Sequence, residues 1–333
     1  MRLPQLIHAT LPGIVSGPGR HERATPDGNP AVRAERLLAA VDSLERVAGL
    51  DAVARPLQRA VRSLPLGRGR DALRGVWLGH PLHPALVQLP IGSWTSAAVL
   101  DLLPGERRAA GLLVALGLAG AVPAALAGWV DWAEQHEQQL RVGVVHAAAN
   151  AAGVLLYSGS LAARLNGRPG LGRALGFAGL GAVTAGGILG GHLAFRQAAG
   201  ANHAENVPHL VAPGWHVLGM LDDFPPDTAV RRLVGEIPVV VVREGEKVHV
   251  LADRCSHLSG PLSQGRTAEG CIECPWHGSV FRLSDGAPMH GPATAPQPRF
   301  ESRITAPGRL EVRLPAGTSA PAHRPGWASS TAG

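Results

Sequence analysis

Four long apolar runs dominate the middle of the chain. Charged residues are confined to the breaks between them and to the edge of the first, and the runs cover 82–103, 109–130, 142–161 and 174–191. Each run, together with its apolar flanks, reaches the length of about 20 residues that a helix needs to cross a bilayer. Four such runs in succession are not typical of the buried helices of a soluble bundle. The pattern predicts four transmembrane helices over 76–198.

An amphipathic region precedes the apolar runs. Between residues 31 and 64, apolar side chains recur at three- and four-residue spacing with arginines between them, which predicts a helical region over 31–75, broken near Pro56. This region either packs on its own chain or lies on an anionic membrane face. The ends, 1–30 and 315–333, have low-complexity compositions rich in Pro with Gly, Ala or Ser and are predicted to be disordered.

The hydrophobic pattern changes after about residue 207. Short β-branched runs at 238–242 and 247–251 flank a charged turn, and three more short strands follow between Asp-Gly and Pro-Gly turns. This predicts an all-β domain over 207–314. The expected fold class is therefore multi-domain, with an all-α four-helix transmembrane bundle followed by an all-β domain.

The charge is strongly biased toward arginine. The 333-residue chain carries a formal net charge of +6, and Lys247 is its only lysine. The excess is densest before residue 75, which suits a membrane surface or a nucleic acid. Because no aromatic-interleaved basic motif or finger spacing is present, we expect a lipid membrane and no nucleic acid as partner.

Three clustered cysteines argue against a secreted disulfide framework and for a metal or redox role in a reducing compartment. The N-terminus has no apolar stretch of the signal-peptide type and no twin arginine before an apolar run. An even number of spans places both ends of the chain on one side. We therefore expect a multi-pass protein of a bacterial inner membrane, with the β domain in the cytoplasm.

The β domain contains two pairs of metal-ligand residues. Cys255 and His257 form a C-x-H pair, Cys274 and His277 form a C-x-x-H pair, and sixteen residues separate the two pairs. Two loops between strands can bring these four side chains together. Two thiolates and two imidazoles suit an iron–sulfur cluster or zinc.

The spacing, together with Pro275, Gly278 and the strand after them, resembles a Rieske domain over 215–314. The resemblance implies a [2Fe-2S] cluster with Cys255 and Cys274 on one iron and the two histidines on the other. Because imidazole ligands are neutral, such a centre has a higher potential than an all-cysteine cluster.

Two departures from the family pattern indicate which kind of Rieske domain this is. Gly260 and Trp276 stand where respiratory Rieske proteins carry a disulfide, so the domain is similar to Rieske ferredoxins. Ser279 matches a serine that donates a hydrogen bond to the cluster in high-potential members, but Phe281 replaces a tyrosine that donates another. The loss of a donor predicts a low-to-intermediate potential.

A zinc module is the alternative interpretation of the same residues. Cys271 and Cys274 have the C-x-x-C spacing of many zinc sites, and two ligands would come from Cys255, His257 and His277. Zinc explains neither the proline and glycine that follow Cys274 nor the β-strand context. We therefore expect Cys271 to be a small buried side chain rather than a ligand.

The membrane part carries histidines at one depth. The sequence GHPLHP at 79–84 resembles the hallmark of a family of bacterial four-span membrane domains of uncharacterised function. His83, His146 and His192 are expected at the edge facing the β domain, where polar side chains need partners. Haem b held between helices by two histidines would satisfy them; a quinone pocket or hydrogen bonds between helices are the alternatives.

The sequence thus favours an integral-membrane electron-transfer protein that serves an unknown redox partner protein or a quinone. His257 and His277 are expected to form its solvent-facing tip. Only about 20 residues follow the last strand, which leaves no room for the separate iron site of an oxygenase catalytic subunit, and no catalytic residue is identified. The alternatives are a ferredoxin-like supplier of electrons to a separate oxygenase and a membrane redox sensor or scaffold with a structural cluster.

Overall fold

The computed structural model of the protein describes residues 30–315. The segments predicted to be disordered, 1–30 and 315–333, lie outside the described residues except for Pro30 and Pro315. By their internal contacts, residues 1–43 and 44–333 form separate units, and the contacts described below lie within the second.

The predicted amphipathic region contains helices α1 (Pro30–Leu44), α2 (Asp51–Ser63) and α3 (Arg68–Arg74). The predicted break near Pro56 is wrong, because α2 continues through this proline. Pro56 lies early in the helix, and its missing N–H deprives only the carbonyl of Ala52, an exposed residue.

Helices α2 and α3 are bound to the loop between α6 (Arg107–Trp132) and α7 (Glu137–Leu165). In this loop the buried carboxylate of Glu134 accepts hydrogen bonds from Arg62 at 2.9 Å and from Arg74 at 3.0 Å. The side chain of Gln58 donates to the carbonyl of Ala133 at 2.7 Å. These contacts favour the first of the two sequence interpretations for α2, in which it packs on its own chain.

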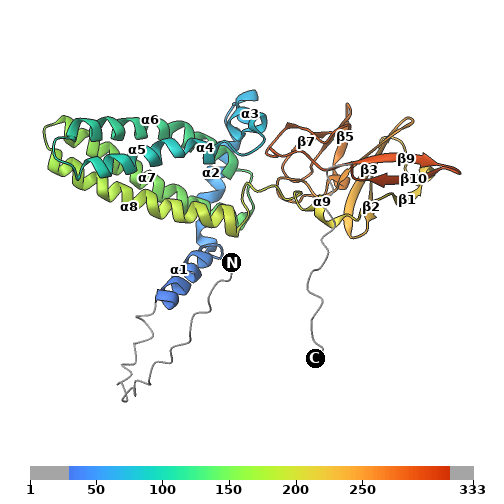
Figure 1. Ribbon diagram of the computed structural model, residues 1–333, viewed down its shortest axis with the longest axis horizontal. Helices are drawn as coiled ribbons and strands as arrows, with labels where there is room; N and C mark the ends of the chain where they lie inside the picture. Colours follow the sequence, from blue (N-terminus) through green and yellow to red (C-terminus); the bar gives the residue numbers. More distant parts are fainter. Residues whose placement is uncertain (1–29, 316–333) are drawn as a thin grey trace, which may run out of the picture. The chain divides into compact units, whose positions relative to one another are not determined.

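Four helical segments run alongside one another (Figure 1) and form the bundle. Three of them are long and apolar enough to cross a membrane: α6, α7 and α8 (Pro169–Gly191) with its π-helical extension His192–Arg196. The fourth, predicted as one span over 82–103, is shorter than expected. It consists of α4 (His83–Leu86) and α5 (Gln88–Leu100).

The interruption of the predicted first span has a local cause. Pro90 has no N–H to donate to the carbonyl of Leu86, so the hydrogen-bond ladder is incomplete between α4 and α5. The 13 residues of α5 extend about 20 Å, which is less than the roughly 30 Å of a hydrocarbon core. Three of the four predicted spans are therefore present at full length among the described residues.

Small residues set the spacing of the bundle helices. The rings of Trp94 and Tyr157 stack with centroids 4.2 Å apart, and a Cβ atom on Gly117 would lie 2.2 Å from the Trp94 indole nitrogen. A Cβ atom on Gly179 would likewise lie 3.0 Å from the ring of Tyr157. Glycines at such contacts let helices of membrane proteins approach closely, which explains why the spans are rich in glycine and alanine.

A buried ion pair joins the far ends of α5 and α7. Arg164 donates to Asp101 through both terminal nitrogens, one of them at 2.9 Å, and the two side chains are only 8% and 7% exposed. Asp101 directly follows α5, so this pair fixes the C-terminal end of the short helix against the long one.

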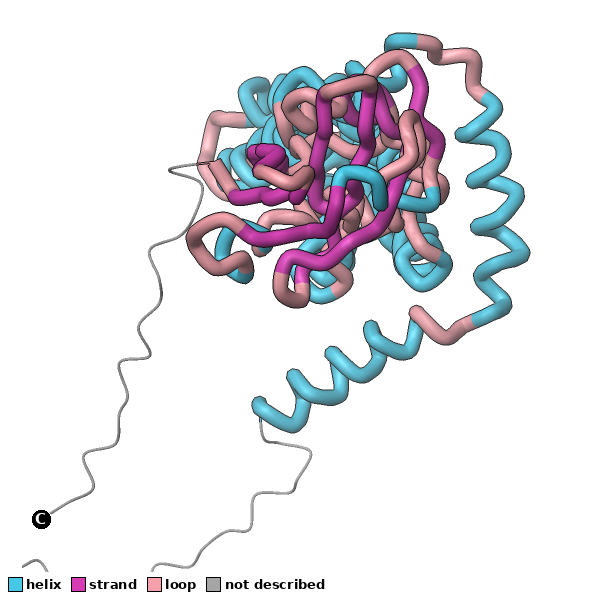
Figure 2. Tube along the Cα trace, turned by 90° about the vertical axis from the view of Figure 1, so that its right-hand side faces the viewer, coloured by secondary structure: helices cyan, strands magenta, loops and turns pink. Residues whose placement is uncertain are grey.

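The C-terminal part is built from strands (magenta in Figure 2) that pair in antiparallel fashion, some joined by short turns and others by long loops. One sheet holds, in spatial order, β1 (His216–Met220), β10 (Arg309–Arg313), β9 (Arg299–Thr305), β4 (Lys247–Ala252), β3 (Ile237–Glu244) and β2 (Ala229–Val234). The other holds β5 (Arg266–Ala268), β6 (Cys271–Glu273), β7 (Val280–Arg282) and β8 (Pro288–His290). The all-β character predicted from the sequence is confirmed.

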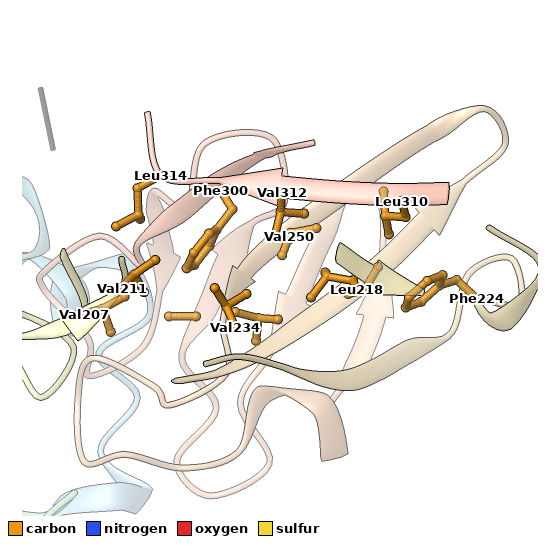
Figure 3. Packing of buried hydrophobic residues seen from close by; sticks show 13 residues of the cluster. Val207, Val211, Leu218, Phe224, Val234, Val250, Phe300, Leu310, Val312 and Leu314 are labelled. Carbon is orange, nitrogen blue, oxygen red and sulfur yellow. The ribbon is translucent and has the colours of Figure 1, made fainter. Parts of the chain in front are cut away.

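Strand β3 separates two hydrophobic cores. Its side chains alternate, so that Val239 and Val241 enter one core and Val240 and Val242 enter the other. The first core is closed by helix α9 (Val207–Leu210) and is shown in Figure 3. The second core contains Cys255 and Cys274, so the candidate metal site is built directly on β3.

We expect Asp101→Asn to destabilise the bundle, because it leaves the Arg164 guanidinium buried without its counter-charge. Breaking a buried pair by removing one partner costs about 3–5 kcal/mol. In detergent, the helical circular dichroism of the variant should melt several degrees below that of the parent protein. Asp285→Asn is the control, because the Arg282–Asp285 pair is exposed and should contribute little. Equal melting temperatures for the two variants would contradict this account.

Candidate iron–sulfur centre

Two tight loops carry the four candidate ligands. Cys255 and His257 follow β4, and their loop closes where Cys255 N donates to the carbonyl of Gly260 at 2.8 Å. Cys274 and His277 lie between β6 and β7, in a loop closed by Cys274 N donating to the Ser279 carbonyl at 2.7 Å. These backbone bonds fix the direction of each ligand pair before any metal binds.

Gly260 permits the two loops to meet. A Cβ atom at this position would lie 2.8 Å from the Cys274 sulfur and 3.1 Å from the ring of Trp276. Any larger side chain would push the loops apart. The sequence drew attention to Gly260 only as a missing cysteine; the structure gives it a steric role.

Gln297 is a second residue whose role the sequence did not indicate. It is 1% exposed, its side-chain oxygen accepts from Ser256 N at 3.0 Å, and its side-chain nitrogen donates to the carbonyl of Ala252 at 2.6 Å. Gln297 therefore holds the first ligand loop to the end of β4. The partners of Gln297 lie 41 and 45 residues away along the chain, so no local sequence pattern could have revealed this role.

The thiols of Cys255 and Cys274 lie close enough to affect each other's protonation, and the backbone at Trp276 and His277 also acts on Cys274. The interaction with Cys255 lowers the pKa of Cys274, while the interaction with Cys274, together with burial, raises the pKa of Cys255. The two thiols therefore titrate as a pair, and metal binding requires both of them as thiolates.

Ser279, which is predicted to donate a hydrogen bond to the cluster, is fully buried. Its hydroxyl oxygen accepts from Ala293 N at 3.1 Å, and its side chain acts to lower the pKa of Cys255. Phe281, fully buried in the same core, has no such donor to offer. The structure therefore supplies one side-chain donor where the high-potential pattern would have two.

The two imidazoles have the spacing of a shared tetrahedral metal. Their ring centroids are 5.1 Å apart with the planes at 88°, and two imidazoles bound to one tetrahedral ion at about 2.0 Å have centroids about 5 Å apart. His257 Nδ1 is buried and has no hydrogen-bond partner among the described residues. Burial lowers the pKa of His257 to about 3, so the ring is neutral and one of its two nitrogens has a free lone pair. The four residues fit a cluster of two irons bound by two thiolates and two imidazoles.

Cys271 lies on β6, opposite Arg282 of β7, and is partly exposed, so the expectation that it is buried is wrong. Burial raises the pKa of its thiol, and the charged groups that act on it most are Arg282 and Glu269. None of the four candidate ligands is among the groups that shift this pKa. This favours the interpretation of Cys271 as a side chain that binds no metal.

The expectation that both imidazoles form a solvent-facing tip is wrong for His257, which is 6% exposed. The histidine edge lies against the α6–α7 loop, where the ring of His136 is 5.8 Å from that of His277 and 5.7 Å from that of Trp276. His203 N also donates to the carbonyl of Ser256 at 2.9 Å. Burial lowers the pKa of His136.

His136 is thus part of the candidate site, although the sequence analysis did not select it. The one available signal is its position: it is the histidine in the charged break between the second and third apolar runs. Because spans return to the same side in pairs, that break faces the side from which the β domain emerges.

The structure separates the three membrane histidines predicted to hold haem. His83 and His146 face each other with ring centroids 6.3 Å apart. His192 is buried elsewhere, with its Nε2 3.1 Å from the carboxylate of Glu45. The three therefore do not form one site.

The β domain is similar to known electron-transfer proteins. The Rieske [2Fe-2S] domain family matches residues 214–301. The ferredoxin subunit of anthranilate 1,2-dioxygenase from Burkholderia cepacia is 37% identical over 100 residues, 30% of this chain and 92% of the relative. Ferredoxin CarAc from Metapseudomonas resinovorans is 35% identical over 92 residues, 27% of this chain and 85% of the relative.

Among solved structures, the ferredoxin of carbazole 1,9a-dioxygenase from Nocardioides aromaticivorans IC177 is 28% identical. It covers 30% of this chain and 98% of its own, with a TM-score of 0.29. In the helical part, residues 79–203 match a family described as a predicted membrane protein (DUF2231). The chain therefore belongs to the Rieske [2Fe-2S] domain family and carries a predicted membrane domain in front of its Rieske domain.

Proposed function

We propose that the protein is an integral-membrane electron-transfer protein whose Rieske centre is held by Cys255, His257, Cys274 and His277. The observation that carries this proposal is the orphaned Nδ1 of His257, buried beside a second imidazole and two adjacent sulfurs. A buried polar atom without a partner is costly, and a metal bond satisfies it. The [2Fe-2S] cluster, when bound, takes up and releases single electrons.

The surrounding residues do the rest of the chemistry. Three groups act to lower the pKa of a ligand cysteine, namely the backbone N–H groups of Trp276 and His277 and the Ser279 hydroxyl. We expect them to donate to the ligand sulfurs and so to stabilise the extra negative charge of the reduced state. The second core excludes water from behind the sulfurs. Of the two ligand histidines, His277 is the one in contact with the membrane domain, because its ring centroid lies 5.8 Å from that of His136.

The proposed membrane topology starts from the three helices that are long and apolar enough to cross a membrane, α6, α7 and α8. We propose that α4 and α5, with the apolar residues that flank them, complete a fourth crossing of a bacterial inner membrane. The Rieske domain then lies on the cytoplasmic side, together with α2 and α3. The bundle provides the second redox group, haem b or a quinone, that links the cluster to the membrane.

Supply of electrons to a separate oxygenase is the second candidate function, favoured by the 37% identity to an oxygenase ferredoxin subunit. A soluble acceptor needs access to the histidine edge. Since His257 is buried and His277 lies against His136, that edge faces the membrane domain, which favours an acceptor or donor in the membrane. A redox sensor or scaffold, the third candidate, needs no reversible electron exchange with a partner.

Replacing any one of the four proposed ligands by alanine should abolish the cluster. In dithionite-reduced membranes, we expect the Rieske electron paramagnetic resonance signal to disappear and the iron and acid-labile sulfide of the purified protein to fall to background. Cys271→Ser is the matched control and should keep both. A zinc protein without a signal, or loss of the cluster in Cys271→Ser, would overturn the assignment; a signal that does not titrate reversibly would favour a structural cluster.

Fluorescent-protein fusions at the two ends of the chain should report the number of crossings. Green fluorescent protein folds in the bacterial cytoplasm but not after export through the general secretory route. Four crossings put both ends in the cytoplasm, so both fusions should fluoresce. If α4 and α5 do not cross, the two ends lie on opposite sides and only one of the fusions will be bright.

Ser279→Ala should lower the reduction potential, because the reduced centre carries more negative charge and loses one donor. A hydrogen bond to a charged group contributes about 1.5 kcal/mol or more, which corresponds to about 60 mV for one electron. Redox titration of the resonance signal measures the shift. Ser284→Ala, an exposed serine on the following turn, should leave the potential unchanged, and an equal shift in both variants would contradict a direct role for Ser279.

A further inference from the structure

The bundle contains a second pair of imidazoles, those of His83 and His146, and both rings make the same kind of contact with a neighbouring helix. His83 of α4 has its Nδ1 2.8 Å from the carbonyl oxygen of Ala124 on α6. His146 of α7 has its Nδ1 2.8 Å from the carbonyl oxygen of Gly186 on α8. Each histidine is thus bonded to the backbone of the helix it packs against.

Each ring also rests on a glycine four residues after the carbonyl it bonds. A Cβ atom on Gly128 would lie 2.8 Å from Nδ1 of His83, and one on Gly190 would lie 3.1 Å from Cε1 of His146. The same carbonyl-plus-glycine arrangement therefore occurs on α6 and on α8. Four segments contribute at one level of the bundle, which is how cofactor sites in helical bundles are built.

The hydrogen bonds decide where the protons are. A carbonyl oxygen can only accept, so Nδ1 carries the proton in both neutral rings, and Nε2 keeps a lone pair. Histidines that bind metals have this arrangement, with the second nitrogen donating to a backbone carbonyl or a carboxylate. The side-chain amide of Asn150 donates to the His146 carbonyl at 2.8 Å, and its nitrogen lies 3.4 Å from both ring nitrogens, so Asn150 also contacts this ring.

The distance between the rings distinguishes this pair from the pair at the cluster. Two imidazoles bound at about 2.0 Å from opposite sides of one metal have centroids about 6 Å apart, whereas a tetrahedral ion brings them to about 5 Å. The observed separation is 6.3 Å for His83 and His146, against 5.1 Å for His257 and His277. The membrane pair therefore has the spacing of trans axial ligands.

We propose that His83 and His146 are the two axial ligands of a haem b in the membrane domain. This assignment rests on the proposed electron-transfer function and names its second redox group. His192 is not a ligand, because its Nε2 is engaged with Glu45.

The position of the pair suits electron exchange with the cluster. His146 lies nine residues into α7 from its first residue, which is about 14 Å along the helix axis. The α6–α7 loop at that end of α7 contacts His277. One electron leaving the cluster, as one of its irons goes from ferrous to ferric, reduces the haem iron from ferric to ferrous.

The test uses the full chain, purified in detergent from cells supplied with a haem precursor. We expect haem b equimolar with the cluster, shown by the reduced-minus-oxidised spectrum and by the pyridine haemochrome. His83→Ala and His146→Ala should each lose it, while His192→Ala and His80→Ala should keep it. Because the ring planes stand at 83°, the ferric protein should give a strongly anisotropic low-spin resonance rather than a rhombic one.

The Rieske resonance, measured in every variant, separates misfolding from loss of a ligand. A variant that keeps this signal and loses haem supports the assignment, and so does haem binding by His146→Gly restored by added imidazole. A protein with the Rieske signal but without haem, or with haem that survives both histidine substitutions, would overturn the haem site and leave the electron-transfer function standing. Haem binding without a Rieske signal would support the haem site and overturn the proposed electron-transfer function of the Rieske centre.

Discussion

The close approach of two loops at Gly260 is the contact on which the candidate centre depends. Two sulfurs can be adjacent only if the backbone of one loop comes within contact distance of Cys274 on the other, and a Cβ atom at this position would prevent it. The loops are brought there by β3, whose alternating valines face two cores at once. Packing on one side of this strand holds the six-stranded sheet together, and packing on the other side holds the ligands.

The histidine edge of this centre is also a domain contact. The ring of His277 contacts that of His136 in the α6–α7 loop. The same loop contains Glu134, which accepts hydrogen bonds from Arg62 and Arg74. A buried carboxylate with two guanidinium partners is costly to separate, so the loop that contacts the centre is fixed by charges from α2 and α3. The amphipathic region thus has a structural task at the redox site, which its arginine-rich composition alone did not reveal.

How much could be predicted from the sequence depended on the range of the interactions. Cys255, His257, Cys274 and His277 stand in a spacing that only a few metal sites use, and the β-branched runs gave the strands around them. The interruption near Pro90 was missed because hydropathy averages over a window, whereas a missing N–H acts at one hydrogen bond. Gln297 and His136 were missed because their partners lie far along the chain, where no period of 2 or 3.6 residues applies.

The membrane histidines show what geometry adds to such a pattern. The sequence placed His83, His146 and His192 at one depth, because helix length converts residue number into height, but it could not say which of them face each other. Which histidines face each other depends on the rotation of each helix about its own axis. This rotation is set by packing of the rings against Gly128 and Gly190 and by their hydrogen bonds to the carbonyls of Ala124 and Gly186. The rings of His83 and His146 then face each other at a centroid distance of 6.3 Å. The ring of His192 contacts the carboxylate of Glu45 instead. Hydrogen bonding of two unrelated histidines would not require the same combination of an accepting carbonyl and a closely packed glycine on both α6 and α8.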